Sequence, residues 1–203
     1  MLHLLGKLPH RVTVACSGGI DSMVLVHFLL KGRKKVSLAF FNHDTKHSKD
    51  AEQFVKRFAG QNRLNLTVGR VKNNRKKGQS MEEFWRDERY AFLESLGAPV
   101  ILTAHHLDDV VETWIMSSMH GNPKIIPHSR NEKVYRPLLP TTREQIEQYA
   151  KHHQVEYIDD PSNQSSKYIR NLVRNEMMDL ILRVNPGIRK TIRKKVIELN
   201  KDL

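Results

Sequence analysis

The chain has 203 residues, of which 39% are hydrophobic, and it carries a formal net charge of +12. This length supports one hydrophobic core of ordinary size. No apolar stretch approaches the roughly 20 residues that a transmembrane helix needs, and the first residues lack the pattern of a secretory signal. Cys16 is the only cysteine, which excludes an internal disulfide and a Cys-x-x-Cys site. We therefore expect a cytoplasmic protein that does not enter membranes.

The first predicted strand, residues 12–16, leads directly into a polar turn that reads Ser17, Gly18, Gly19, Ile20, Asp21, Ser22. Two glycines let an anion approach the backbone, and a helix starting near Ile20 directs its free NH groups and positive dipole end to the same place. The turn lacks the lysine of a Walker A loop, so backbone amides and the Ser17 and Ser22 hydroxyls would hold the phosphates. The alternative is a flexible turn in which Asp21 only serves the helix dipole.

Short apolar runs then alternate with amphipathic stretches, which indicates an α/β fold with a doubly wound, mainly parallel sheet. The predicted strands are residues 12–16, 36–41, 66–71 and 100–103, and the predicted helices are residues 20–31, 49–63, 81–96 and 110–119. In such a sheet the ligand lies beyond the carboxyl ends of the strands. The polar loops 17–22, 42–44 and 104–109 should therefore meet at one edge.

A second chemical cluster follows the fourth predicted strand and contains His105, His106, Asp108, Asp109 and Glu112. In a helix that begins near residue 107, Asp109 and Glu112 lie on one face. Such a face can hold Mg²⁺ or accept a proton, and hard carboxylates beside a phosphate turn suit Mg²⁺ better than zinc. The alternative is that these acids only cap the helix and interact favourably with the positive end of its dipole.

Beyond Gly121 the chain is irregular and contains several prolines until Thr142 opens another helix, and residues 185–187 divide the C-terminal segment into two helices. Basic side chains are concentrated in two places. Residues 167–203 contain ten basic and four acidic side chains, and residues 70–77 contain five basic and no acidic ones. Both segments are suited to a polyanion such as nucleic acid, and a solvated face without a partner is the alternative.

Several of these segments resemble one known family. Residues 17–22 are similar to the SGGxDS signature of the N-type ATP pyrophosphatase, or PP-loop, superfamily. Residues 104–113 resemble the AHHxDDxxET segment of the tRNA(Ile)-lysidine synthetase family. Further matches, in the order of that family, are Asn42 and His43; Glu82, Arg86, Arg89 and Tyr90; Arg136, Pro137, Leu138, Leu139 and Arg143; and Asp160, Ser162, Asn163, Arg170, Asn171 and Arg174. The likeness covers about residues 12–182.

The resemblance implies an adenine nucleotide alpha hydrolase-like fold, with a PP-loop ATP-binding catalytic domain over residues 1–163 and a small, basic helical extension over residues 164–203. It implies that ATP adenylates the C2 oxygen of the wobble cytidine in a tRNA(Ile) with a CAU anticodon. The ε-amine of L-lysine then replaces AMP and forms lysidine. Mg²⁺ would assist the first step. Lysine is almost wholly protonated at neutral pH, so the second step needs a group that takes its proton.

The resemblance also assigns roles to individual side chains. The residues expected to bind ATP are Ser17, Gly18, Gly19, Asp21 and Ser22. Those expected to act in catalysis are Asp21, His106, Asp109 and Glu112, with Asp21 and Asp109 as magnesium ligands. Those expected to bind substrate or phosphate are His43, Arg86, Arg136, Arg170 and Arg174. In the last predicted helix, a broad basic face that we expect to bind the tRNA backbone consists of Arg189, Lys190, Arg193, Lys194 and Lys195.

Two features differ from the family pattern. Residues 120–123 read His-Gly-Asn-Pro where the family usually has a glycine-rich stretch opening with Arg-Gly. Bacterial members also normally continue into C-terminal domains that grip the tRNA, a task that a homodimer, a partner or the helix over residues 190–201 could take over here. Three other functions stay open: a thiolating PP-loop enzyme, which usually needs catalytic or cluster-binding cysteines; a small-molecule adenylating ligase that forms amides; and an inactive tRNA-binding relative.

Overall fold

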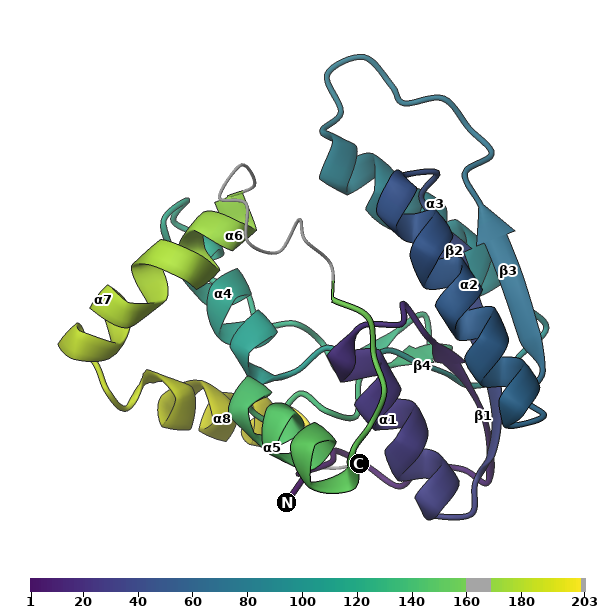
Figure 1. Cartoon of the computed structure of the whole chain (residues 1–203). Coiled ribbons are helices and arrows are strands. Elements are labelled where there is room, and N and C mark those ends of the chain that lie inside the picture. The colour runs from purple at the N-terminus through teal and green to yellow at the C-terminus, as the bar shows by residue number, and fades with distance from the viewer. Residues whose placement is uncertain (160–168, 202–203) are drawn as a thin grey trace.

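The computed structural model describes residues 1–159 and 169–201 (Figure 1). Its sheet has the strand order β3-β2-β1-β4-β6-β5, and every neighbouring pair is parallel except β5 and β6. The strands are β1 (Arg11–Ala15), β2 (Lys35–Asn42), β3 (Leu66–Arg70), β4 (Ile101–Leu102), β5 (Ser129–Arg130) and β6 (Val134–Tyr135). The helices are α1 (Ile20–Lys31), α2 (Lys46–Gln61), α3 (Met81–Ser95), α4 (Leu107–Ser118), α5 (Arg143–His153), α6 (Ile169–Leu172), the π-helix η2 (Val173–Met177), α7 (Met178–Val184) and α8 (Ile188–Glu198). The predicted doubly wound, mainly parallel sheet is confirmed.

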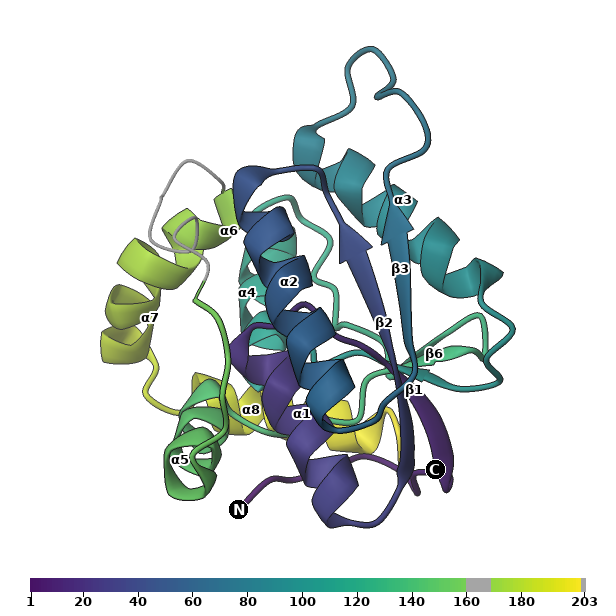
Figure 2. The ribbon, with the colours of Figure 1, turned by 45° about the vertical axis from the view of Figure 1, so that its right-hand side comes forward.

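Helices cover both faces of the sheet. On one face, α1, α2 and α5 bury apolar side chains such as Val24, Val55 and Ile146 in one core with β1 and β2. On the other face, Tyr90 and Leu93 of α3 belong to a smaller core with residues of β2, β4 and β6. Figure 2 shows α1 and α2 lying next to each other on the same side of the sheet. The loops that follow the parallel strands therefore emerge together at one edge of the sheet, between the helical layers.

The C-terminal helices pack against α4. Val111 and Ile115 of α4 share a buried cluster with Val173 of η2 and with Ile188 and Ile192 of α8. The predicted domain boundary between residues 163 and 164 lies outside the described residues and stays a prediction. No helix in the described ranges is long and apolar enough to cross a membrane.

Three features differ from the sequence predictions. Helix α2 begins at Lys46 instead of residue 49, because the Ser48 NH donates to Thr45 Oγ1 and the Thr45 NH donates to Ser48 Oγ in a reciprocal cap. Helix α4 begins at Leu107, the start considered for the acidic cluster, and not at residue 110 as the apolar pattern alone predicted. The segment after Gly121, predicted to be irregular, contains the β5–β6 hairpin, whose two-residue strands are too short for any hydrophobic periodicity.

Candidate active site

The turn after β1 is shaped by glycine and closed by a serine hydroxyl. Gly18 has a φ of +85°, and a Cβ at this position would lie 3.1 Å from Ile158 Cγ2, so a larger residue would be strained there. The Ser22 hydroxyl donates to the Gly19 carbonyl at 2.9 Å and accepts from the Ser17 NH at 3.2 Å. Ser22 thus braces the turn, while the more exposed Ser17 and the first amides of α1 are the groups that can meet a phosphate.

The Asp21 side chain points from the first turn of α1 toward the acidic cluster of α4. Its Oδ1 atom is buried without a hydrogen-bond partner in the described structure and lies 3.6 Å from His106 Nε2. The same imidazole nitrogen lies 3.6 Å from Asp109 Oδ2. Because His106 is 1% exposed and neither ring nitrogen forms a hydrogen bond to another described residue, one buried imidazole separates two carboxylates from different elements.

Asp109 and Glu112 are held together by an arginine from the π-helix. Arg174 Nε donates to Glu112 Oε1 at 2.7 Å, and its Nη2 donates to Glu112 Oε2 at 3.0 Å and to Asp109 Oδ1 at 3.1 Å. Arg170 lies farther away, with Nη1 4.0 Å from an oxygen of each acid. Single π-turns within helices are frequent at functional sites, and η2 here brings a guanidinium onto the carboxylate pair.

The surroundings separate the proton affinities of the three acids. Burial raises the pKa of Glu112, and the bonds from Arg174 only partly oppose this effect. Burial also acts to raise the pKa of Asp109, but the His106 side chain, the His106 NH and Arg174 together hold that pKa well below its usual range. Burial raises the pKa of Asp21 against the opposing effect of His106. Asp109 is therefore the permanent negative charge of the cluster, and Glu112 and Asp21 bind protons more readily than ordinary carboxyl groups.

A basic cluster surrounds Tyr90 on α3. Four guanidinium carbons lie between 4.3 and 6.0 Å from the centroid of the Tyr90 ring; they belong to Arg86, Arg89, Arg130 and Arg136. Arg136 is 3% exposed and donates to the Pro127 carbonyl and the Tyr90 hydroxyl, yet its Nε atom is buried without a partner in the described structure. Buried cations of this kind are suited to an anionic ligand.

Two histidines expected near the site have different surroundings. His105 Nδ1 lies 2.9 Å from Thr103 Oγ1, and burial lowers the pKa of His105 to about 3, so the ring is neutral. His43 follows β2 and packs its ring against the rings of Phe41 and Trp85. These ring contacts place His43 beside α3, at the same edge of the sheet as the acidic cluster.

Asp108 has a role that the sequence did not reveal. Its Oδ1 accepts a hydrogen bond from Arg189 Nε of α8 at 2.8 Å, and its Oδ2 accepts one from the Arg143 NH at the start of α5 at 2.8 Å. This carboxylate therefore joins three helices. Arg189 was predicted to face RNA, and 81 positions of chain separate it from Asp108, so no local pattern could have indicated the pair.

The remaining predicted residues of α8 differ in exposure. Lys190, Lys194 and Lys195 are exposed, whereas Arg193 is only partly exposed and its Nε atom is buried. The predicted matches Asp160, Ser162 and Asn163 lie outside the described residues. The single cysteine, Cys16, is buried, and burial raises the pKa of its thiol to about 11, as expected for a packing residue.

The fit of the site to Mg²⁺ depends on Asp21 and Asp109. Residues 1–159 and 169–201 contain no group of three or more His, Cys, Asp or Glu side chains able to form a complete metal site. Mg²⁺ commonly binds through only one or two carboxylates together with substrate phosphates and water. The unpartnered Asp21 Oδ1 and the ionised Asp109 carboxylate beside the phosphate turn fit this kind of site.

The glycine turn between β1 and α1, together with the polar strand ends beside it, defines a nucleotide-site architecture of the PP-loop class. The PP-loop domain family, ATP_bind_3, matches residues 2–181, and the chain belongs to this family.

Several curated tRNA(Ile)-lysidine synthases are similar to this chain. That of Persephonella marina is 36% identical over 193 residues, covering 88% of this chain and 43% of the relative. That of Nitrosomonas europaea is 29% identical over 197 residues (90% and 43%), and that of Thermotoga maritima is 32% identical over 192 residues (87% and 46%). The chain thus spans less than half the length of these relatives.

Solved structures support the fold. The U34-tRNA thiolase NcsA from Methanococcus maripaludis, solved with its [4Fe-4S] cluster, matches with a TM-score of 0.74 at 18% identity, covering 97% of this chain and 74% of that one. The NH3-dependent NAD synthetase from Campylobacter jejuni matches with a TM-score of 0.52 at 14% identity, covering 95% and 86%. At these identities the likeness concerns the fold alone.

Proposed function

We propose that this chain catalyses ATP-dependent formation of lysidine at the wobble cytidine of a tRNA(Ile) with a CAU anticodon. The observation that carries the proposal is the cluster of Asp21, His106, Asp109 and Glu112 beside the turn after β1, in which His106 and Glu112 are buried. The similarity to lysidine synthases over most of the chain supports the choice of substrate. A cytoplasmic location and a homodimer stay predictions from the sequence.

In the first step, the C2 oxygen of the cytidine attacks the α-phosphorus of ATP, and the bond to the departing pyrophosphate breaks. The first amides of α1, with Gly18, Gly19 and the Ser17 hydroxyl, would bind the triphosphate, while Ser22 keeps the turn in shape. Asp21 and Asp109 would hold a Mg²⁺ ion, which when bound neutralises charge on the phosphate oxygens.

In the second step, the lysine ε-amine attacks C2, the C2–O bond breaks and AMP leaves. The incoming lysine is an ammonium ion and must first lose a proton. Asp109, whose pKa lies well below its usual range, would stay ionised and attract this cation. Glu112, whose pKa is raised by burial, would accept the proton, with His106 as the neighbouring group that could receive it next.

Two arginines would control access to the acids. Arg174 forms two hydrogen bonds with Glu112 and one with Asp109, so an ammonium ion that reaches these oxygens competes with a guanidinium for the same sites. Arg170 donates to Thr113 Oγ1 at 3.2 Å, and its Nη1 lies 4.0 Å from an oxygen of each acid. We infer that substrate entry shifts Arg174 toward the phosphates, where its charge would stabilise the departing AMP.

The basic cluster around Tyr90 would hold an anionic part of the substrates. Arg136 and Arg89 are the inner members, and Arg86 is exposed at the rim. His43, at the end of the neighbouring strand, would line the same space. A phosphate next to the flipped-out cytidine is the ligand that this role requires.

The deciding experiment uses labelled lysine. The purified chain is incubated with ATP, labelled L-lysine and a tRNA(Ile) transcript with a CAU anticodon, and a transcript with uridine at the wobble position is the control. We expect label on the cytidine transcript alone, with one AMP and one pyrophosphate released for each lysine incorporated. Pyrophosphate release without lysine incorporation would refute the proposal, and so would equal incorporation into the cytidine and uridine transcripts.

A further inference from the structure

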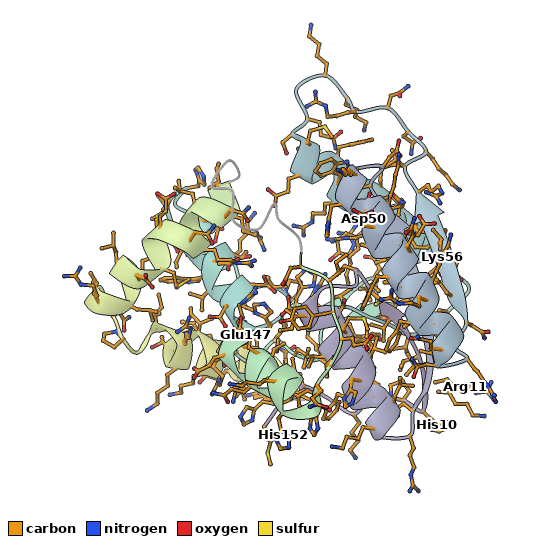
Figure 3. All side chains as sticks on the ribbon, viewed as in Figure 1. His10, Arg11, Asp50, Lys56, Glu147 and His152 are labelled. Atoms are coloured by element: carbon orange, nitrogen blue, oxygen red, sulfur yellow. The ribbon has the colours of Figure 1, made fainter. Side chains whose placement is uncertain are left out.

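The connection between β3 and α3 forms a prominent basic loop. Residues 72–77, called here the basic loop, project beyond the ends of β3 and α3 at the top of Figures 1 and 2. The loop contains Lys72, Arg75, Lys76 and Lys77 and no acidic residue, and all four side chains are exposed. Figure 3 shows nitrogen-tipped side chains that extend from this loop away from the rest of the molecule.

The base of the loop is fixed by a buried carboxylate. Glu88 of α3 is 9% exposed. Its Oε2 accepts hydrogen bonds from the backbone NH groups of Lys72 at 2.8 Å and Asn73 at 3.2 Å, and its Oε1 accepts one from the Asn73 side chain. The bonds from Asn73 and Lys72 hold the pKa of Glu88 below its usual value. The chain direction at the start of the loop is therefore set by α3.

The far end of the loop is fixed by Gln79. Its carbonyl accepts from Arg75 Nη1 at 2.9 Å, its side-chain oxygen accepts from the Lys76 NH at 3.4 Å, and its side-chain amide donates to Asp87 Oδ2 at 2.9 Å. None of the four basic side chains forms a salt bridge with a carboxylate in the described part of the chain. The loop thus has an ordered shape before any partner binds, and its charges are available.

The loop lies at the same edge of the sheet as the candidate active site. It follows the carboxyl end of β3, as the phosphate turn follows β1 and His105 follows β4. Helix α8, the other basic element, lies at the bottom of Figures 1 and 2, at the opposite end of the molecule from the loop. In α8, Arg189 is also already paired with Asp108.

We propose that the basic loop binds the sugar-phosphate backbone of the RNA next to the nucleotide that enters the active site. This inference builds on the proposed function, because an RNA substrate is assumed. The loop supplies point charges on flexible side chains over an ordered backbone, which suits phosphate contacts and does not read bases. Its role is to orient the RNA over the strand ends.

The first test compares two triple variants with the same change in charge. Lys72→Ala, Lys76→Ala and Lys77→Ala are combined in a loop variant, and Lys190→Ala, Lys194→Ala and Lys195→Ala in an α8 variant. Binding of a labelled CAU anticodon stem-loop is titrated at several salt concentrations. The loop variant should lower the log-log salt slope by up to roughly 2 to 3, at about 0.7 to 0.9 for each phosphate that the protein no longer neutralises. The α8 variant should lower it less.

An unchanged slope in the loop variant, with a reduced slope in the α8 variant, would overturn the inference. Failure of this inference can be distinguished from failure of the proposed function. If the wild-type chain transfers no lysine but its RNA binding depends on the loop, the loop binds RNA and the proposed reaction is wrong. If lysine transfer occurs and the loop variant binds RNA as the wild type does, the reaction stands and the inference is wrong.

The second test asks whether RNA binding depends on the fixed conformation of the loop or only on the net charge of the protein. Glu88→Ala adds one positive charge to the protein, so an electrostatic effect alone would strengthen RNA binding. We expect weaker binding, because the loop loses the carboxylate that fixes its base. Glu83→Ala makes the same charge change at an exposed position of α3 and should not weaken binding. Glu88→Gln, which keeps one acceptor, serves if Glu88→Ala unfolds, and RNA binding as tight as that of Glu83→Ala in a folded Glu88 variant would contradict the proposed ordering.

Discussion

Asp109 and Glu112 lie one turn apart on α4, and their surroundings shift their pKa values in opposite directions. Glu112 is buried and Asp109 is largely buried, which favours the neutral carboxyl group in both. The charge of Asp109 is stabilised more strongly because the His106 side chain, the His106 NH and Arg174 surround it, whereas Glu112 relies mainly on Arg174. Pairs of acids separated in this way commonly divide the tasks of holding charge and moving protons.

Replacing Glu112 by Gln tests whether Glu112 moves the proton while Asp109 holds the charge. The change removes the proton acceptor while keeping its size, so lysine transfer should fall at least ~100-fold, the usual effect of losing an acid–base group. ATP-dependent pyrophosphate release should change less. Asp109→Asn should reduce both steps, because Asp109 also lies beside the phosphate turn. Single-turnover measurements of pyrophosphate and lysidine distinguish the two steps.

Glu144→Gln, at an exposed position of α5, is the matched control for these amide variants. It makes the same chemical change away from the cluster and should leave both steps at the wild-type rate. Undiminished lysidine formation in Glu112→Gln and Asp109→Asn would mean that the acids only start a helix.

His105 should make the fold sensitive to acid. Burial lowers its pKa from the ordinary 6.5 to about 3 in the folded chain. Between these two values only the unfolded chain takes up the proton, so the free energy of unfolding decreases as pH falls from 6.5 toward 3. One such group contributes a slope of up to about 1.4 kcal/mol per pH unit. Urea unfolding of His105→Gln across this range should show a shallower pH dependence than wild type; equal slopes would place the proton uptake on other groups.

At the scale of elements, the phosphate turn depends on one backbone conformation. Gly18→Ala introduces a Cβ at positive φ and 3.1 Å from Ile158. We expect a loss of about 1–3 kcal/mol in the free energy of unfolding together with weaker ATP binding. Gly60→Ala, in α2 with nothing within 4 Å of the new Cβ, is the control and should stabilise by up to about 1 kcal/mol. Chemical denaturation and ATP titration check both, and a Gly18→Ala protein as stable as Gly60→Ala would contradict the strained turn.

The sequence predicted those elements whose signals are local. The strand–turn–helix around Gly18 carries its own glycine and periodicity signals, and four strands with their crossover helices follow from alternating apolar patterns. The start of α2 was missed by three residues because Thr45 and Ser48 cap each other, which is a weaker signal than Glu or Gln at that position. Two-residue strands such as β5 have no period to detect.

The site was predictable in part for the same reason. Asp109 and Glu112 are three positions apart, so a helix necessarily places them together. The bond from Arg174 to Glu112 spans 62 positions, and it depends on how η2 packs against α4. Only the resemblance to a family pointed to Arg174, as a residue that binds substrate or phosphate. Its contacts with the two carboxylates were not indicated by the resemblance.

At the scale of the whole molecule, α4 connects the sheet to the C-terminal helices. Its buried face shares one cluster with η2, α7 and α8, and Asp108 adds polar links to α5 and α8. Asp109 and Glu112 lie on the same helix. The position of Asp109 and Glu112 relative to the phosphate turn therefore depends on contacts made by residues far along the chain.

Arg189 provides a test of this arrangement, because a guanidinium that pairs with Asp108 is less available to RNA. Arg189→Gln should lower the free energy of unfolding by about 1–3 kcal/mol, since it leaves the largely buried Asp108 carboxylate with one partner fewer. Lys190→Gln removes the same charge from an exposed neighbour and should leave stability unchanged. A double-mutant cycle with Asp108→Asn should give a coupling energy of at least about 0.5 kcal/mol. If Arg189→Gln is as stable as Lys190→Gln and reduces the salt slope of RNA binding more, Arg189 serves the RNA and the Asp108 pair is incidental.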